Sequence, residues 1–516
     1  MVMKFALNSY NIDILKNYLF SFLNLFLRIS LNLIAIPILS DTPVILAIYS
    51  ICISFGIFFR YTDFGFITSG KKYAAEHVIS NDLDLQLKLL GNSFSISFLI
   101  SLILSVLIFI ISFSPEIIIS DLKQNNQYNY IASILLITLS ISSLIQIFSN
   151  YVSSLFEINL KKYYCDIISI ATALVSLLIF FIIDKTNEHW ILTYYISIKI
   201  LDFIFLVCII FLTNQKFKIT LIQLLINFRI KKNLIRKALK LSLTSIISFF
   251  FGFIFYELDN LFLAQNIDLV SVSMYSIAAL GPFVIKTVFS LLYSPFSAIF
   301  NYLKNEKKLY KEYFNKIIVF FFPITFIGII TIVLFSEKLI FSYVGSNYNE
   351  SIWPFVYLSL AWCFSFIIYP TGIYLFSMEF NKRIILSSFA PPFLFWTLNL
   401  YSLQIYGNIS IEVFCFNKMC SNIVILPLYI YYLVKDNFID IKLMNKLFKS
   451  ILFSSFIVLI FYFPYDYFLN DEKNILGLII NIFFIGALII LIKLIDLKVN
   501  KNQIDIKKIL LNTLQF

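Results

Sequence analysis

Charged residues are scarce in this chain of 516 residues: they make up 13% of it, whereas 60% of the residues are hydrophobic. Water-soluble domains are nearer half apolar and a quarter charged. The chain therefore has too little polar surface to enclose hydrophobic cores in water, and a soluble globular protein is excluded. We expect lipid to be the solvent for most of the sequence.

Histidine and cysteine are also rare, with two and six residues. His77 and His189 are too far apart in the expected topology to form a metal pair, and all six cysteines fall in apolar runs, where they serve as small apolar filler. No serine, histidine and acid combination and no glycine-rich phosphate motif stands out. We expect no metal, no cofactor, no disulfide and no enzymatic activity.

Long apolar runs are abundant instead. About 20 residues of helix cross about 30 Å of hydrocarbon, and fourteen such runs occur, at about 15–39, 43–60, 91–113, 129–153, 165–183, 190–212, 241–263, 272–298, 314–335, 352–377, 384–403, 411–434, 450–469 and 475–495. A transmembrane barrel would show alternating segments of about ten residues. The sequence predicts an all-α membrane protein with about 14 transmembrane helices, the first run staying in place as the first span because it shows no signal-peptidase site.

Lysine and arginine indicate the orientation, because short loops rich in them stay in the cytoplasm. With the N-terminus inside, 32 of these residues fall in cytoplasmic segments and four in external loops. One missed span would scramble the alternation. We expect both termini to be cytoplasmic. The net charge of +11 then reflects topology and contact with anionic membrane lipids, not nucleic-acid binding.

The longest basic loop, 214–240, suggests the organisation. It separates six predicted spans from eight, so we predict an N-terminal six-helix bundle (1–213), this basic cytoplasmic linker, a C-terminal six-helix bundle (241–435), and a last helix pair with a cytoplasmic tail (436–516). Prolines are more frequent in the later spans, among them Pro370, Pro391, Pro392 and Pro427. Each invites a kink, which either faces lipid or lets the second half bend during transport.

Candidate site residues are the charges inside predicted spans: Arg28, Lys199, Asp202, Lys286 and Lys418. Each would cost about 2.5–3.5 kcal/mol at the bilayer centre if it faced lipid, so we expect them to face a cavity. Arg28 lies on a helix face with Ser21, Asn24 and Asn32, and Lys286 shares a face with Ser290 and two further serines. Lys199 has Asp202 at i+3 as an expected partner.

Four cations against one carboxylate predict a positively charged, water-filled cavity between the two halves. A phosphate or diphosphate suits such a site because it accepts several charge-assisted hydrogen bonds, while Ser, Asn and Tyr suit sugar hydroxyls. Other interpretations stay open: Arg28 could snorkel, Lys199 and Asp202 could be a structural pair, and Lys286 and Lys418 could bind carbonyls at helix breaks.

Two sequence segments carry a family resemblance. FRYTDFGF at 59–66, with Asp63 and Gly65, is followed by GKKYAA at 70–75; ELDNLFLAQNIDLVSVSMYSIAALGPFVIKTVFSLLYSPF at 257–296 contains Asp259, Tyr275 and Pro295. Together with Arg28, Pro37 and fourteen spans, these motifs resemble polysaccharide-transport proteins of the multidrug/oligosaccharidyl-lipid/polysaccharide exporter superfamily. The segment SDTP at 40–43 lacks the glycine-rich turn usual in the family, and AQ at 264–265 replaces its usual glycine.

The resemblance implies an O-antigen flippase of the bacterial cell inner membrane. Such a protein moves an undecaprenyl-diphosphate-linked oligosaccharide from the inner to the outer leaflet by alternating access, with Arg28, Lys199, Lys286 and Lys418 meeting the headgroup beside Asn24, Asn32 and Ser290. Asp202 is the candidate for coupling to a proton or sodium ion, and a polysaccharide polymerase and a chain-length regulator are candidate protein partners. An O-antigen polymerase, a lipid-linked glycosyltransferase and a drug exporter on the same fold are the alternatives.

Overall fold

The computed structural model describes residues 2–61, 65–75, 77–78, 82–230, 246–302, 306–367, 369–378, 380–438 and 445. All regular secondary structure among these residues is helical. The chain divides into two compact units, Met1–Val270 and Ser271–Phe516, and each is described by itself. The expected spans at 450–469 and 475–495, and the cytoplasmic tail, lie outside the described residues.

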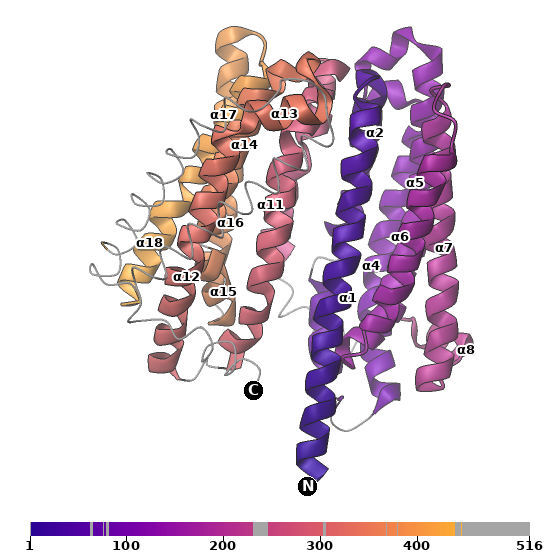
Figure 1. The fold of residues 1–516 in the computed structure, drawn as a ribbon, viewed down its shortest axis with the longest axis vertical. Coiled ribbons are helices and arrows are strands. Elements are labelled where there is room, and N and C mark those ends of the chain that lie inside the picture. The colour runs from indigo at the N-terminus through magenta and orange to yellow at the C-terminus, as the bar shows by residue number, and fades with distance from the viewer. Residues whose placement is uncertain are drawn as a thin grey trace. The chain divides into compact units, whose positions relative to one another are not determined.

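The first unit consists of long helices that run side by side (Figure 1). Its helices are α1 (Val2–Leu39), α2 (Pro43–Tyr61), α3 (Phe66–Ala75), α4 (Leu83–Ile111), α5 (Asn126–Ile158), α6 (Tyr163–Ile182), α7 (Trp190–Phe217), α8 (Leu221–Asn227) and α10 (Asp259–Asn266), with two 3-10 turns, η1 (Pro115–Ile117) and η2 (Ser120–Gln124). Residues 246–256 are also helical. The second unit contains α11 (Leu269–Tyr302), α12 (Lys307–Leu334), α13 (Ser336–Val344), η4 (Ser346–Ser351), α14 (Ile352–Ile367), α15 (Tyr369–Ser377), α16 (Asn381–Tyr406), α17 (Ile411–Ile423) and α18 (Ile425–Lys435).

Among the residues that the structure describes, eight helical segments are long and apolar enough to cross a membrane: Lys16–Leu39, Leu83–Ile111, Asn126–Ile158, Tyr163–Ile182, Trp190–Phe217, Ile246–Asn266, Asn381–Tyr406 and Ile411–Lys435. Pro43–Phe59 and Leu269–Phe283 are shorter apolar helices. The prediction of an all-α, multi-pass membrane protein is confirmed for the described residues. The total of fourteen spans and the cytoplasmic location of both termini stay predictions.

Small residues let the helices of the first unit approach closely. The buried face of α4 carries Ser97, Ser101 and Ser105, and the Ser105 hydroxyl donates to the Ser140 carbonyl oxygen on α5 at 2.6 Å. A Cβ added at Gly91 would lie 2.1 Å from the Asn227 carbonyl oxygen, so only glycine allows α8 to pack on α4 at this point. Such stripes of small residues are typical of helix packing in membranes.

Gly65 shows why one position of the family motif is a glycine. It lies directly before α3 with φ at 77°, a left-handed conformation that L residues with a side chain adopt at a cost. Its carbonyl oxygen accepts hydrogen bonds from the backbone nitrogen and the hydroxyl of Ser69, at 3.0 and 2.8 Å. Asp63 of the same motif lies outside the described residues.

The two compact units adjoin in the sequence after Val270, whereas the predicted bundles are separated by the loop 214–240. The segment after that loop groups with the first unit because Asn260 of α10 donates to the Ser54 hydroxyl of α2 at 2.8 Å. In addition, the Leu269 amide donates to the Asp121 carboxylate of η2 at 2.9 Å. The assignment of domains by function stays a prediction.

Prolines of the second unit lie both near helix starts and inside helices. The expected span at 352–377 contains α14 and α15 on the two sides of residue 368, which is outside the described residues, and Pro370 is the second residue of α15. The expected span at 411–434 is likewise α17 and α18, with Pro427 in the first turn of α18. Proline fits such a position because first-turn amides have no intrahelical acceptor. Pro391 and Pro392, in contrast, lie inside the continuous helix α16.

Candidate functional site

The polar face predicted on α1 lies against α6, which runs beside it (Figure 1). Asp166 and Ser169 are one helical turn apart on α6, and each is only 4% exposed. The Ser21 hydroxyl donates to one oxygen of the Asp166 carboxylate at 2.6 Å, and the Asn24 amide donates to the other at 3.1 Å. A buried carboxylate thus fixes the position of two residues of the α1 stripe.

Arg28 continues this network on the same helix face. Its Nε donates to Asn24 Oδ1 and to Ser169 Oγ, both at 3.2 Å, and its Nη2 donates to Ser169 Oγ at 2.8 Å. The Ser169 hydroxyl itself donates to Asn24 Oδ1 at 2.7 Å. Because the Asn24 amide nitrogen donates to Asp166, the Asn24 amide oxygen faces the guanidinium.

The guanidinium keeps part of its hydrogen-bonding capacity. Arg28 is exposed, and the residues that the structure describes give its Nη1 no hydrogen-bond acceptor. An arginine that is oriented through Nε and Nη2 and still offers an N–H edge is suited to binding a planar or tetrahedral oxyanion. We name this group of Asn24, Arg28, Asp166 and Ser169 the Arg28 network.

Lys199 on α7 has different neighbours. Its Nζ lies 3.4 Å from the Asp202 carboxylate and 5.3 Å from the centre of the Tyr195 ring. The expected partnership with Asp202 one turn along the helix is confirmed. Tyr195 also meets Tyr49 of α2 edge to face, with ring centres 6.2 Å apart. The carboxylate offsets the charge of Lys199, which favours the structural-pair interpretation for this cation.

The two lysines of the second unit lie over aromatic rings. Lys286 of α11 is half-buried, with its Nζ 4.5 Å from the centre of the Trp362 ring on α14. Lys418 of α17 is 4% exposed, and its Nζ lies 5.2 Å from the centre of the Phe395 ring on α16. Next to Lys418, the Asn417 amide donates to Asn399 Oδ1 at 2.9 Å and to Ser402 Oγ at 3.3 Å.

The structure brings only part of the predicted site together. Arg28 and Asn24 share one network, Lys199 and Asp202 form a pair, and each of these groups has its own surroundings. The side chains of Asn32, Ser290 and Pro295 are not among those described. Convergence of cations from the two halves on one cavity stays a prediction.

The remaining motif residues lie within the helix packing. Asp259 opens α10 and is 1% exposed. Tyr275 of α11 is 6% exposed and meets the Phe414 ring of α17 edge to face, with ring centres 6.0 Å apart. Both side chains are buried inside their own units and take part in the packing of helices.

Sequence reasoning gave Asp166, Ser169 and Trp362 no role in the site. Asp166 is the second residue of the expected span 165–183, and a charge at a span end can reach interfacial water. A signal was nevertheless present, because Asp166, Ser169, Ala173 and Ser176 recur at spacings of three and four residues and are all buried on one face of α6. No comparable pattern pointed to Trp362.

A second ionic group ties helices of the second unit together at their ends. Arg383 of α16 donates through both terminal nitrogens to the Asp436 carboxylate, with Nη2 at 3.2 Å, and the Tyr374 hydroxyl of α15 donates to the same carboxylate at 2.7 Å. Burial alone would raise the pKa of Asp436, but the hydrogen bonds from Arg383 and Tyr374 outweigh it and lower this pKa below its ordinary value. The group is structural.

Among the described residues, no three His, Cys, Asp or Glu side chains are placed to hold a metal ion together. The five described cysteines, Cys52, Cys165, Cys208, Cys415 and Cys420, form no disulfide with one another.

Long apolar helices define a multi-pass membrane protein, and its fold is that of known transporters. The lipid II flippase MurJ in an inward closed conformation is similar over 93% of this chain and 99% of that chain, with a TM-score of 0.67 and 15% identity. An inward-facing multidrug resistance MATE family transporter of the MOP superfamily gives a TM-score of 0.60 at 14% identity, over 79% of this chain and 94% of that chain.

A third solved structure shares the fold with a different pocket. This structure is a MOP superfamily transporter from Pyrococcus furiosus, for which the reverse polarity of the binding pocket suggests a different function. It gives a TM-score of 0.50 at 13% identity, over 83% of this chain and 96% of that chain. No protein-family model and no curated protein matches the sequence. At these identities the likeness shows a common fold, and function must be argued from the residues.

Proposed function

We propose that this chain is a flippase that moves an undecaprenyl-diphosphate-linked oligosaccharide from the inner to the outer leaflet of a bacterial inner membrane. The oligosaccharide would be the repeat unit of O-antigen or of a related surface polysaccharide. The observation that carries the proposal is the Arg28 network, in which an intramembrane guanidinium is oriented by an amide and a hydroxyl. The shared fold with a lipid II flippase supports it.

A diphosphate matches what this network offers. Phosphate oxygens accept charge-assisted hydrogen bonds from guanidinium groups, which are about twice as strong as bonds between neutral groups. The Nη1 edge of Arg28 is the donor available to such an oxygen. The Asn24 amide and the Ser169 hydroxyl are already engaged with Arg28, so they would orient this donor while the guanidinium makes the phosphate contact.

Lys286 and Lys418 would add positive charge from the second unit. An aromatic ring stabilises an ammonium group without neutralising it, by about 0.5–2 kcal/mol depending on solvation. The contacts with Trp362 and Phe395 hold both ammonium groups in place among the helices of the second unit. Lys199 contributes less because Asp202 offsets it.

We assign the coupling of transport to a proton or sodium ion to a carboxylate. Asp202 was the candidate from the sequence, and it is 36% exposed on its side chain beside Lys199. Asp166 is a second candidate because it is buried in direct contact with the residues that orient Arg28. A proton or sodium ion at either carboxylate would alter these contacts during alternating access. Polysaccharide polymerase and chain-length regulator remain the proposed protein partners.

Drug export on the same fold is the second candidate function. The likeness to a multidrug resistance MATE family transporter favours it, and a buried carboxylate such as Asp166 could accept a cationic drug. The hydrogen bonds from Ser21 and Asn24 occupy both oxygens of that carboxylate, however, and the exposed charge beside it is the positive one of Arg28. We therefore rank flipping of an anionic lipid first. Polymerase or glycosyltransferase activity remains as the enzymatic alternative.

A translocation assay tests the proposal. The full chain is reconstituted in proteoliposomes that contain a fluorescent undecaprenyl-diphosphate-oligosaccharide, and a reductant added outside reports the fraction moved between leaflets. We expect translocation by the wild type and about a hundredfold slower rate for Arg28→Ala, as fits loss of a charge-assisted contact worth about 3 kcal/mol. Lys286→Ala should slow it less.

Lys123→Gln is the matched control, because it removes one positive charge from η2 outside the long helices and should leave the rate unchanged. An unchanged rate in both Arg28→Ala and Lys286→Ala would reject the assigned site. Export of an organic cation at equal rates in the presence and absence of Arg28, with no movement of the lipid, would favour the drug exporter instead.

A further inference from the structure

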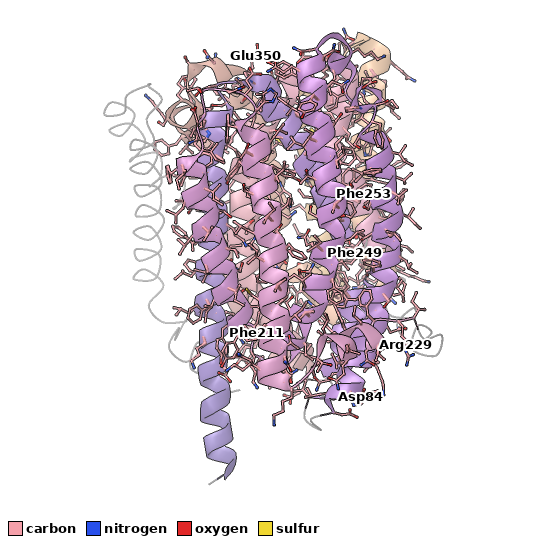
Figure 2. The ribbon with its side chains drawn as sticks, turned by 90° about the vertical axis from the view of Figure 1, so that its right-hand side faces the viewer. Asp84, Phe211, Arg229, Phe249, Phe253 and Glu350 are labelled. Carbon is pink, nitrogen blue, oxygen red and sulfur yellow. The ribbon has the colours of Figure 1, made fainter. Side chains whose placement is uncertain are left out.

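The outer face of α6 and α7 carries an apolar groove that the transport proposal does not use. Its volume is about 510 Å³, and it is lined by Tyr164, Ile167 and Ile168 of α6 and by Val207, Cys208 and Phe211 of α7. Ile167, Val207 and Phe211 are 42%, 51% and 62% exposed. Figure 2 shows Phe211 on the face of the unit turned to the viewer, near the end that carries Asp84 and Arg229.

Basic side chains surround one end of this groove. Lys216 Nζ lies 4.5 Å from the centre of the Tyr164 ring, which itself lines the groove. Lys161 Nζ lies 5.2 Å from the centre of the Phe217 ring, and Lys16 Nζ lies 5.4 Å from the centre of the Tyr163 ring. The Tyr163 ring lies beside that of Tyr164, tilted by 32°. We name these three lysines the basic rim. All three belong to segments that the charge distribution predicts to be cytoplasmic.

Neighbouring acidic groups leave the basic rim positive. Glu157 is engaged with Lys71 at 2.6 Å, and within the part of the chain that the structure describes none of the three lysines of the basic rim forms an ion pair. Aromatic contacts hold the three lysines in place without cancelling their charge. The arrangement therefore combines an apolar surface at hydrocarbon depth with positive charge at headgroup depth.

We propose that this groove binds an anionic phospholipid of the inner leaflet. One acyl chain lies between α6 and α7, and the phosphate contacts Lys161 and Lys216. Lys216 follows Val207 by nine positions on α7, which is about 13 Å along the helix axis. If a lipid phosphate lies at the basic rim, the part of the acyl chain nearest the headgroup therefore reaches the groove. Each lysine near an anionic surface contributes about 1 kcal/mol, which is about a fivefold preference over a zwitterionic lipid for one lysine and about 25-fold for the two together.

Photolabelling of the full chain tests this assignment. The protein is reconstituted in phosphatidylcholine vesicles that contain a trace of phosphatidylglycerol with a photoactivatable acyl chain, and labelled peptides are mapped by mass spectrometry. We expect adducts at 164–168 and 207–212, and about 25-fold fewer from the matching phosphatidylcholine probe. Equal labelling by both probes, or adducts spread evenly over all exposed helices, would overturn the proposal without any variant being needed.

Variants separate the two parts of the site. Lys161→Gln and Lys216→Gln should each reduce phosphatidylglycerol labelling about fivefold, and Val207→Trp should block the groove for both probes. Lys185→Gln is the matched charge control because Lys185 also lies over a ring, Phe180, but in the loop at the other end of α6. Ile103→Trp on the exposed face of α4 is the control for bulk.

The outcome is independent of the transported substrate, since it is read without transport. Unchanged labelling in Lys161→Gln and Lys216→Gln, with normal thermal unfolding of both variants, would reject the basic rim. Stronger labelling by a polyprenyl phosphate probe than by phosphatidylglycerol would also overturn the assignment, because the groove would then select the carrier lipid and not a bulk anionic phospholipid.

Discussion

The two units place cations among apolar helices in different ways. In the first unit, Arg28 donates hydrogen bonds to the Asn24 amide oxygen, which the buried Asp166 carboxylate helps to orient, and to the Ser169 hydroxyl. In the second unit, Lys286 and Lys418 lie over the rings of Trp362 and Phe395. The planar guanidinium has fixed donor directions, whereas an ammonium group is a rotatable point charge.

Under the proposed function, this difference suits the two units to different parts of headgroup binding. The Arg28 network can fix the orientation of an anion, because its donors are aligned before a ligand arrives. The lysines of the second unit can attract charge without prescribing a geometry. On our account, Arg28 selects for a phosphate and the lysines strengthen its binding.

The largest expected effect comes from removing the carboxylate of the Arg28 network. Asp166→Ala deprives Ser21 and Asn24 of their acceptor in a site that is 4% exposed. Hydrogen bonds to charged groups contribute about 1.5–3 kcal/mol each, so we expect about 3 kcal/mol of lost stability, measured by unfolding of the purified protein in detergent.

Asp184→Ala is the matched control, since Asp184 caps only its own loop through Thr186 and should leave the unfolding transition where it is. An unchanged transition in Asp166→Ala would mean that α1 does not depend on the network for its docking on α6, and the comparison between the units would lose its basis.

The second effect is a pH dependence in the second unit. The pKa of Asp436 is lowered below its ordinary value of 3.8, so the ionised form stabilises the folded state. This contribution is fully present above pH 3.8 and is lost as the pH falls through the lower folded pKa. We expect Asp436→Asn to be less stable than the wild type at pH 7, with the difference shrinking toward pH 3 in thermal unfolding.

Arg383→Lys serves as the control because it keeps the charge and loses the second donor nitrogen to Asp436. It should fall between the wild type and Asp436→Asn. A stability difference between wild type and Asp436→Asn that stays constant from pH 7 to pH 3 would contradict the assignment of an ionised Asp436 in this group.

The smallest expected effect concerns the aromatic contact of the second unit. Trp362→Leu removes the ring below Lys286, while Trp362→Phe keeps a smaller ring there. Cation–π contacts contribute about 0.5–2 kcal/mol, so we expect Trp362→Leu to be about 1 kcal/mol less stable than Trp362→Phe in detergent unfolding. The double variants with Lys286→Met should remove this difference; its persistence would show that the ring acts through packing alone.

Much of the helical framework could be predicted because apolar length alone identifies a membrane-spanning helix. The helix α1 and its polar face followed from Ser21, Asn24 and Arg28, and the Lys199 and Asp202 pair followed from i+3 spacing. The start of α18 inside the expected span 411–434 was harder to predict, because Pro427 lies near a helix start while Pro391 and Pro392 lie inside the continuous helix α16.

The partners of the site cations could not be predicted because they come from other helices. Helix spacing shows which residues share a face, but not which face the next helix presents to it. Asp166 is a span-end charge in the sequence and becomes the anchor of the Arg28 network only when α6 packs on α1. Trp362 similarly gains its role from the approach of α14 to Lys286.

Binding of the diphosphate headgroup by Arg28 is tested most directly by affinity. Purified wild type, Arg28→Lys and Arg28→Ala are compared in nanodiscs for binding of an undecaprenyl-diphosphate-oligosaccharide and of the matching monophosphate. The account predicts that Arg28→Ala weakens diphosphate binding about a hundredfold, that Arg28→Lys recovers only part of it, and that the monophosphate loses less. Equal affinities of wild type and Arg28→Ala for the diphosphate would contradict it.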